Sequence, residues 1–92
     1  MQILLSEQAM QDLFDISLYT LDNWGEKQKD KYLKYIQKRL DTIATITRQG
    51  KLVFKTSFYE ERVLYLKHYA AYYLLFNEYI YVERVVNFNL NT

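Results

Sequence analysis

The sequence predicts an α+β fold in which an N-terminal helical hairpin packs on a twisted antiparallel β-sheet. In the first half of the chain, apolar residues recur every three or four positions, which is the spacing of one helix face. After Gly50 the pattern changes to runs rich in tyrosine, valine and leucine. Seven of the ten tyrosines lie beyond residue 58, and such residues favour strands.

Length and composition indicate a single domain spanning residues 1–92. Half of the 92 residues are hydrophobic, which argues against disorder. The absence of cysteine excludes disulfides, thiolate metal sites and cysteine nucleophiles. The chain begins without the basic region of a signal peptide, and no apolar run approaches the roughly 20 residues of a membrane span. We therefore expect a soluble, cytoplasmic protein without membrane contact.

Two amphipathic helices are expected, over residues 7–22 and 26–47. Ser6 stands at the N-cap of the first helix, and the sequence Asn23-Trp24-Gly25 separates the two. Such a short connection makes the helices antiparallel neighbours. The expected apolar face of the first helix consists of Ala9, Leu13, Ile16 and Thr20, widened by Met10, Phe14 and Leu21, whereas Asp12, Asp15 and Asp22 lie away from it.

The remaining elements are predicted to be strands. The expected segments are residues 2–5, 62–67, 69–76 and 79–88, with residues 51–55 as a short strand or an irregular loop. The segment 69–76 is nearly all apolar, so we expect it in the centre of the sheet. Asn77-Glu78 is predicted to form a two-residue hairpin turn.

The charge is unevenly distributed along the chain. The net charge is only +1, but residues 1–26 carry −5 and residues 27–55 carry +7. Stand-alone nucleic-acid-binding proteins are usually more basic, so stable nucleic-acid binding is not expected. A lysine ridge on the second helix is either its solvated face or a surface for an acidic partner or nucleic acid; it consists of Lys27, Lys31, Lys34 and Lys38.

No motif for covalent, metal or cofactor chemistry is present. The single histidine, His68, is either a turn residue bonded to the backbone or a general acid–base. Glu60 and Glu61 would point to opposite faces of a strand, which indicates a solvated edge rather than paired catalytic carboxylates. The basic residues of the sheet form either an anion-binding patch or structural salt bridges; they are Arg62, Lys67 and Arg84. The exposed tyrosines suit contact with a protein partner.

In their order and spacing, several segments resemble the ParE branch of the RelE/ParE toxin superfamily. The resemblance spans nearly the whole chain. It rests on Ala9, Asp12, Leu13, Ile16, Tyr19, Trp24-Gly25, Gln28 and Tyr32 in the hairpin, Gly50 after it, and Arg62, Leu64, His68, Tyr72 and Arg84-Val85-Val86 on the sheet.

This resemblance implies the toxin of a type II toxin–antitoxin pair. ParE toxins act on DNA gyrase, and a small antitoxin whose disordered C-terminal segment folds along the toxin silences them. Gyrase and the antitoxin are therefore the expected partners, and no cofactor or metal is implied. The candidate residues for binding the target or the antitoxin are Trp24, Arg62, Lys67, His68, Tyr72 and Arg84.

Two alternatives remain. One is a RelE-like, ribosome-dependent messenger RNA endoribonuclease, which would use Arg62, Lys67, His68 and Arg84. The other is a toxin fold that has lost activity and survives as a binding module. The sequence favours the ParE-like function without catalytic residues. Leu64 stands where a ribonuclease would carry a second basic residue, and residues 87–91 offer no acid–base group.

Overall fold

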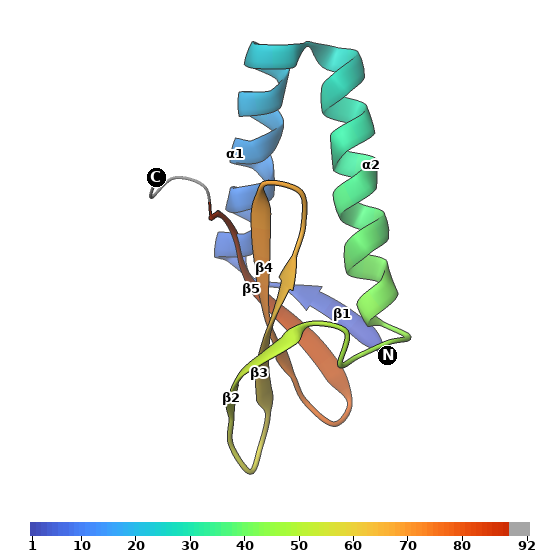
Figure 1. Cartoon of the computed structure of the whole chain (residues 1–92), viewed down its shortest axis with the longest axis vertical. Coiled ribbons are helices and arrows are strands. Elements are labelled where there is room, and N and C mark those ends of the chain that lie inside the picture. The colour runs from blue at the N-terminus through green and yellow to red at the C-terminus, as the bar shows by residue number, and fades with distance from the viewer. Residues whose placement is uncertain (89–92) are drawn as a thin grey trace.

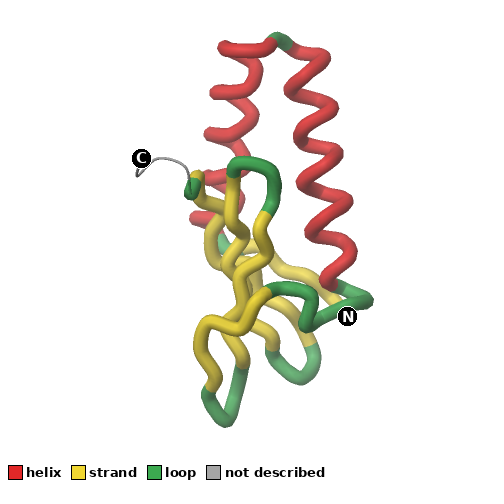
Figure 2. Tube along the Cα trace, viewed as in Figure 1, coloured by secondary structure: helices red, strands yellow, loops and turns green. Residues whose placement is uncertain are grey.

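A computed structural model describes residues 1–88 and arranges them as two helices on one face of a five-stranded sheet (Figures 1 and 2). The elements follow in the order β1 (Gln2–Leu5), α1 (Glu7–Trp24), α2 (Glu26–Ile43), β2 (Lys51–Lys55), β3 (Glu60–Tyr65), β4 (Tyr69–Leu75) and β5 (Tyr79–Asn87). The predicted α+β fold class is confirmed. Residues 87–91 were expected to offer no acid–base group, and of these, residues 89–91 lie outside the described residues. Within the described part, no helix is long and apolar enough to cross a membrane.

A single glycine joins the two helices. Gly25, with a φ of 88°, ends α1 and immediately precedes α2. Trp24 therefore still belongs to α1, which was expected to end at residue 22. At the other end, the Ser6 hydroxyl accepts a hydrogen bond from the Ala9 N–H at 2.8 Å, as an N-cap does. α2 ends at Ile43 and not at residue 47, because β-branched threonines and isoleucines crowd this stretch and lose rotamer freedom in a helix.

The sheet has the strand order β1-β5-β4-β3-β2. β4 lies in the centre, as its apolar sequence predicted. Neighbouring strands are antiparallel except β1, which pairs with β5 in parallel, so the sheet is mixed. The two helices connect β1 at one edge of the sheet to β2 at the opposite edge. Asn77 and Glu78 form the expected tight turn, closed by a hydrogen bond from the Phe76 N–H to the Tyr79 carbonyl at 3.0 Å.

The strand ends differ slightly from the predicted ones. β3 begins at Glu60 and ends at Tyr65, whereas residues 62–67 were expected. The reason is a tight turn at Lys67 and His68, closed by a hydrogen bond from the Leu66 N–H to the Tyr69 carbonyl at 2.7 Å. His68 adopts a φ of 73°, which identifies it as a turn residue. Residues 51–55 form a strand, β2, and not an irregular loop.

The core lies between the hairpin and the sheet. Its largest fully buried side chains are Tyr73, Ile36, Ile43, Ile80 and Val82. On α1 the predicted face is confirmed at Ala9, Ile16 and Thr20. Met10, Phe14 and Leu21, expected to widen that face, are exposed instead. A helix turns about 100° per residue, so these three side chains point away from the Ala9–Ile16 row and the sheet.

Gly50 lies in close contact with the core residue Tyr73. A Cβ atom at this position would meet the Tyr73 hydroxyl at 2.8 Å and the Val63 carbonyl oxygen at 2.9 Å. The Gly50 N–H also donates to that hydroxyl at 3.0 Å. We expect Gly50→Ala to lower the free energy of unfolding by about 1–3 kcal/mol, because the backbone or a fully buried ring must shift. Urea unfolding measures this loss; Lys51→Ala, at an exposed neighbour, is the near-neutral control, and equal midpoints would contradict the expectation.

Candidate functional site

Two adjoining hollows form a groove, which we call the hairpin groove. The larger has a volume of about 540 Å³ and the smaller about 400 Å³. Both are lined by Tyr19 of α1, Tyr69 of β4 and Asn87 of β5. The larger hollow is completed by Thr20, Trp24, Gln28, Tyr32, Lys67 and His68. The smaller is completed by Asp12, Asp15, Ile16, Arg84, Val85 and Val86.

The hairpin extends beyond the sheet, past the β3–β4 turn (Figure 1). Residues of both the hairpin and this turn line the larger hollow. Two tyrosines of α2 attach that turn to the hairpin. The Tyr32 hydroxyl donates a hydrogen bond to the Lys67 carbonyl, and the Lys67 N–H donates to the Tyr35 hydroxyl at 3.1 Å. Burial, followed by the nearby Tyr69 and Tyr35, raises the pKa of Tyr32 above its ordinary value. Tyr32 therefore stays a neutral donor at physiological pH.

Aromatic side chains dominate this hollow. Trp24 is 68% exposed and Tyr19 is 57% exposed, although both lie on a well-formed helix. The Tyr32 ring lies 6.1 Å from the Tyr69 ring, centroid to centroid. Large, rigid aromatic side chains at the edge of a concave surface are typical of protein interfaces, where they supply much of the binding energy.

The structure brings four of the six predicted candidate residues to the hairpin groove. Trp24, Lys67 and His68 line the larger hollow, and Arg84 lines the smaller. Tyr72 lies half-buried on β4 and does not line the groove. Arg62 lies in a separate polar network. Tyr19, Tyr69 and Asn87, which join the two hollows, were not predicted as site residues.

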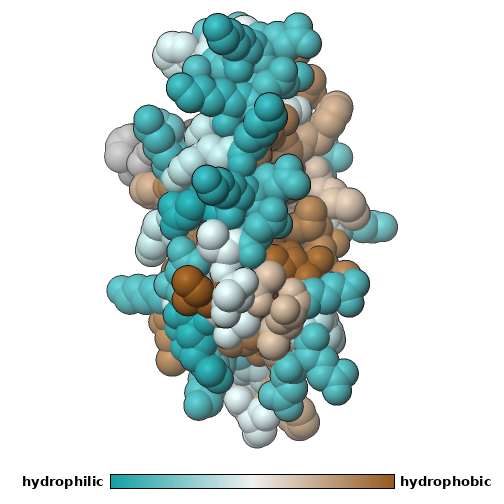
Figure 3. Space-filling model, turned by 90° about the vertical axis from the view of Figure 1, so that its right-hand side faces the viewer, coloured by the Kyte–Doolittle hydropathy of each residue, from teal (hydrophilic) through white to brown (hydrophobic). Residues whose placement is uncertain are grey.

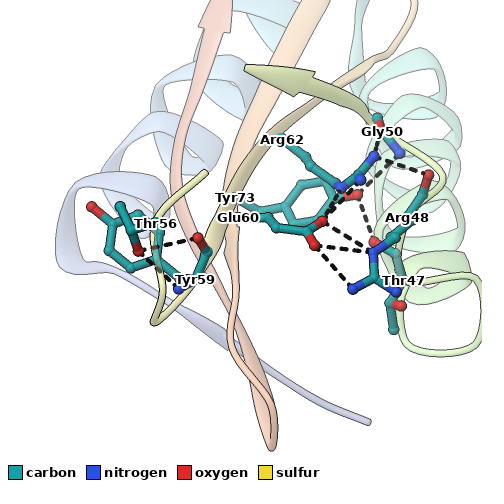
Figure 4. A network of polar contacts seen from close by, with 8 residues as sticks. All are labelled: Thr47, Arg48, Gly50, Thr56, Tyr59, Glu60, Arg62 and Tyr73. Atoms are coloured by element: carbon teal, nitrogen blue, oxygen red, sulfur yellow. Dashed lines mark hydrogen bonds and ion pairs between the residues drawn. The ribbon is translucent and has the colours of Figure 1, made fainter. Parts of the chain in front are cut away.

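Arg62 belongs to an ion-pair network between β3 and the segment that follows α2 (Figure 4). Glu60 binds Arg62 at 2.8 Å and Arg48 at 2.9 Å, and Arg62 also donates to the Gly50 carbonyl at 2.7 Å. Hydrogen bonds from Arg48 and Arg62 lower the pKa of Glu60 from 4.5 to about 2. Only 8% of Glu60 is exposed, so the prediction of a solvated edge was wrong for this residue.

Arg84 is held by Asp12 of α1. The Arg84 guanidinium donates to the Asp12 carboxylate at 2.9 Å, and the Val85 N–H donates to the same carboxylate at 2.8 Å. Val85 lies on β5 beyond the segment that pairs with β1. Asp12 therefore accepts a hydrogen bond from an N–H of β5 that lies outside this pairing. Its side chain was expected to lie away from the core face, but only 7% of Asp12 is exposed.

The four residues proposed for ribonuclease activity do not share one hollow. Lys67 and His68 lie in the larger part of the groove, Arg84 is paired with Asp12, and Arg62 is paired with Glu60. Both guanidinium groups therefore already neutralise carboxylates of the fold. Among residues 1–88, no group of three histidine, aspartate or glutamate side chains is placed to hold a metal ion.

Comparisons with known proteins identify the family. The fold is similar to that of a solved structure described as "Chromosomal ParDE TA system from P. aeruginosa", with a TM-score of 0.75, 16% sequence identity and coverage of 95% of each chain. A search among curated proteins gives no significant match. Residues 3–87 match the family model of the ParE toxin of the type II toxin–antitoxin system parDE, so the chain belongs to that family.

Proposed function

We propose that this ParE-type toxin inhibits DNA gyrase in the cytoplasm by binding it as a protein, and that the hairpin groove carries the contact. Family membership supports the class of function. The observation that supports the location is the exposure of Trp24 and Tyr19 at the same hollow as Lys67 and His68. We also propose that a cognate antitoxin neutralises the toxin through a C-terminal segment that is disordered until it binds.

The ribonuclease alternative receives less support. General acid–base cleavage of RNA needs its catalytic groups within hydrogen-bond reach of one ribose and phosphate. Arg62 and Arg84 instead form ion pairs with Glu60 and Asp12. The basic residues that line the larger hollow are Lys67 and His68.

Replacing Trp24 should weaken gyrase inhibition. We expect half-inhibition of supercoiling to need at least about tenfold more of the Trp24→Ala variant than of the wild type. The reason is that exposed tryptophans at concave surfaces often dominate the binding energy. The assay measures supercoiling by purified gyrase against toxin concentration. Phe58→Ala is the matched control, since Phe58 is an aromatic residue that is 79% exposed and lies outside the groove.

Four outcomes, two from this assay and two from expression in cells, are decisive. Inhibition by the wild-type toxin that the antitoxin relieves would support the proposal. No inhibition at a large molar excess would refute it. Cleaved transcripts in growth-arrested cells, with supercoiling unaffected, would identify the ribonuclease alternative, and expression without growth arrest would identify an inactive binding module.

A further inference from the structure

The outer face of α1 carries an apolar row that the other elements within residues 1–88 leave exposed. It consists of Met10, Phe14, Leu18 and Leu21, whose exposed fractions are 51%, 56%, 45% and 38%. Spaced by four, four and three residues, they lie on one face of the helix. We call these four residues the outer row. Figure 3 is turned toward the side on which α2 lies in Figure 1, and it shows a largely hydrophilic face with apolar side chains along one edge.

An acidic row runs next to the outer row. Met10, Phe14 and Leu21 are each followed by a polar or acidic residue, so that Gln11, Asp15 and Asp22 share the adjoining strip of the helix. The Gln11 amide donates to the Asp15 carboxylate at 2.9 Å, which leaves the negative charge in place.

No ion pair within the described residues neutralises this acidic row. Residues 1–26 contain no lysine or arginine. Within residues 1–88, neither Asp15 nor Asp22 takes part in an ion pair. The lysine-rich α2 forms its ion pair internally, between Lys29 and Asp30. The opposite charges of the two helices therefore do not meet in ion pairs across the hairpin.

A second copy of the chain fits the outer row poorly. Two α1 helices packed against each other would bring together their acidic rows, and like charges disfavour such a contact. The lysine ridge of another copy would supply cations, but Lys27, Lys31, Lys34 and Lys38 are all exposed polar residues that offer no apolar surface. An anionic membrane surface is disfavoured by the same negative charge.

We infer that the outer row is the docking site for an amphipathic helix of a partner protein, with apolar residues on one face and lysine or arginine beside them. The apolar face covers Phe14 and its neighbours, and the basic side chains pair with Asp15 and Asp22. This is a helix-on-helix contact with anchors spaced i, i+4 and i+7. The outer row lies on a different side of α1 from Ile16 and Tyr19, which line the hairpin groove. Asp15 stands between the two sites and also lines the smaller hollow.

Two synthetic amphipathic helical peptides test this inference on the whole protein. Both carry leucines at i, i+4 and i+7; one has lysines beside them and the other has glutamates. Fluorescence anisotropy of the labelled peptides should show binding of the lysine peptide only, with an affinity that falls as salt rises. We expect Phe14→Gln to weaken this binding about tenfold and Asp15→Asn to weaken it about two- to fivefold.

The matched control is Lys31→Gln on the exposed face of α2, which should leave binding unchanged. Met10→Gln repeats the test at a second position, and circular dichroism checks that each variant is folded. Equal binding of both peptides, or unchanged binding by Phe14→Gln and Met10→Gln, would overturn the inference. Dimerisation of the toxin through the outer row, with an affinity that rises with salt, would also overturn the inference, because a second copy of the chain would then occupy the site. These outcomes do not depend on whether gyrase is the target.

Discussion

Replacing Glu60 by glutamine should lower the free energy of unfolding by about 2–4 kcal/mol. The carboxylate pairs with Arg62, whose side chain is only 13% exposed, so the variant leaves a nearly buried guanidinium without its counter-charge. The pair with Arg48 contributes less, because that side chain is 66% exposed and water screens its charge. Chemical denaturation at neutral pH measures the loss.

Glu61→Gln is the matched control for this experiment. Glu61 follows Glu60 in the sequence, but it interacts with Glu83 on the same sheet. Burial, followed by the hydrogen bond and charge of Glu61, raises the pKa of Glu83. Removing the Glu61 charge relieves a repulsion, so this variant should be as stable as the wild type or slightly more stable. Equal losses in the two variants would contradict the assignment of the ion pair to Glu60.

The pH dependence provides a second check on Glu60. Its pKa is lower in the folded protein than its ordinary value of 4.5, so its ionised form stabilises the fold. This contribution is fully present above pH 4.5 and is lost as the pH falls toward about 2. The difference in stability between the wild type and Glu60→Gln should therefore shrink over that range. A difference that stays constant down to pH 2 would show that the carboxylate charge is not responsible.

These ion pairs also change the interpretation of the basic residues. From the sequence, Arg62 and Arg84 were equally consistent with an anion-binding patch and with structural salt bridges. In the structure each binds a carboxylate, Glu60 or Asp12. Substituting either arginine should therefore affect the stability of the fold, so loss of toxicity in such variants would not by itself identify a target-binding residue.

The hairpin and the strands were predictable because their signals are local. The N-cap at Ser6, the break at Gly25 and the apolar runs act over a few neighbouring residues. The burial of the two carboxylates, Asp12 and Glu60, was not predictable, because it depends on partners that are distant in the sequence. Asp12 and Arg84, for example, are 72 positions apart. Periodicity placed Asp12 on the polar side of α1, and only the position of β5 shows why a charge is tolerated there.

The candidate site was predictable in part for the same reason. Trp24 stands out as the single tryptophan beside a helix break, and Lys67-His68 stands out at a turn. Tyr19 and Tyr69 lie 50 positions apart and meet only because the hairpin extends over the β3–β4 turn. Their role in joining the two hollows follows from tertiary packing, for which the sequence alone offered no signal.

Asp12→Ala should lower the free energy of unfolding by about 1–3 kcal/mol, chiefly because it leaves a buried backbone donor unsatisfied. The substitution leaves the Val85 N–H without its acceptor. It also removes the counter-charge of Arg84, but that side chain is 48% exposed, so water screens this part of the loss. Asp12→Asn should lose less, because an amide oxygen can still accept from Val85. Asp15→Asn, three residues further along α1, removes an exposed carboxylate and should change stability by no more than about 0.5 kcal/mol.

A double-mutant cycle separates the ion pair from the other contacts of Asp12. Asp12→Ala, Arg84→Ala and the double variant should give a coupling energy different from zero, because the two side chains are in direct contact. Burial alone would raise the pKa of Asp12, but hydrogen bonds from Arg84, Val85 and Gln8 lower it below 3.8. The stabilisation is therefore present above pH 3.8 and lost as the pH falls through the lowered pKa, so the coupling should shrink in acid. A coupling near zero at neutral pH would show that Asp12 acts through the Val85 N–H alone.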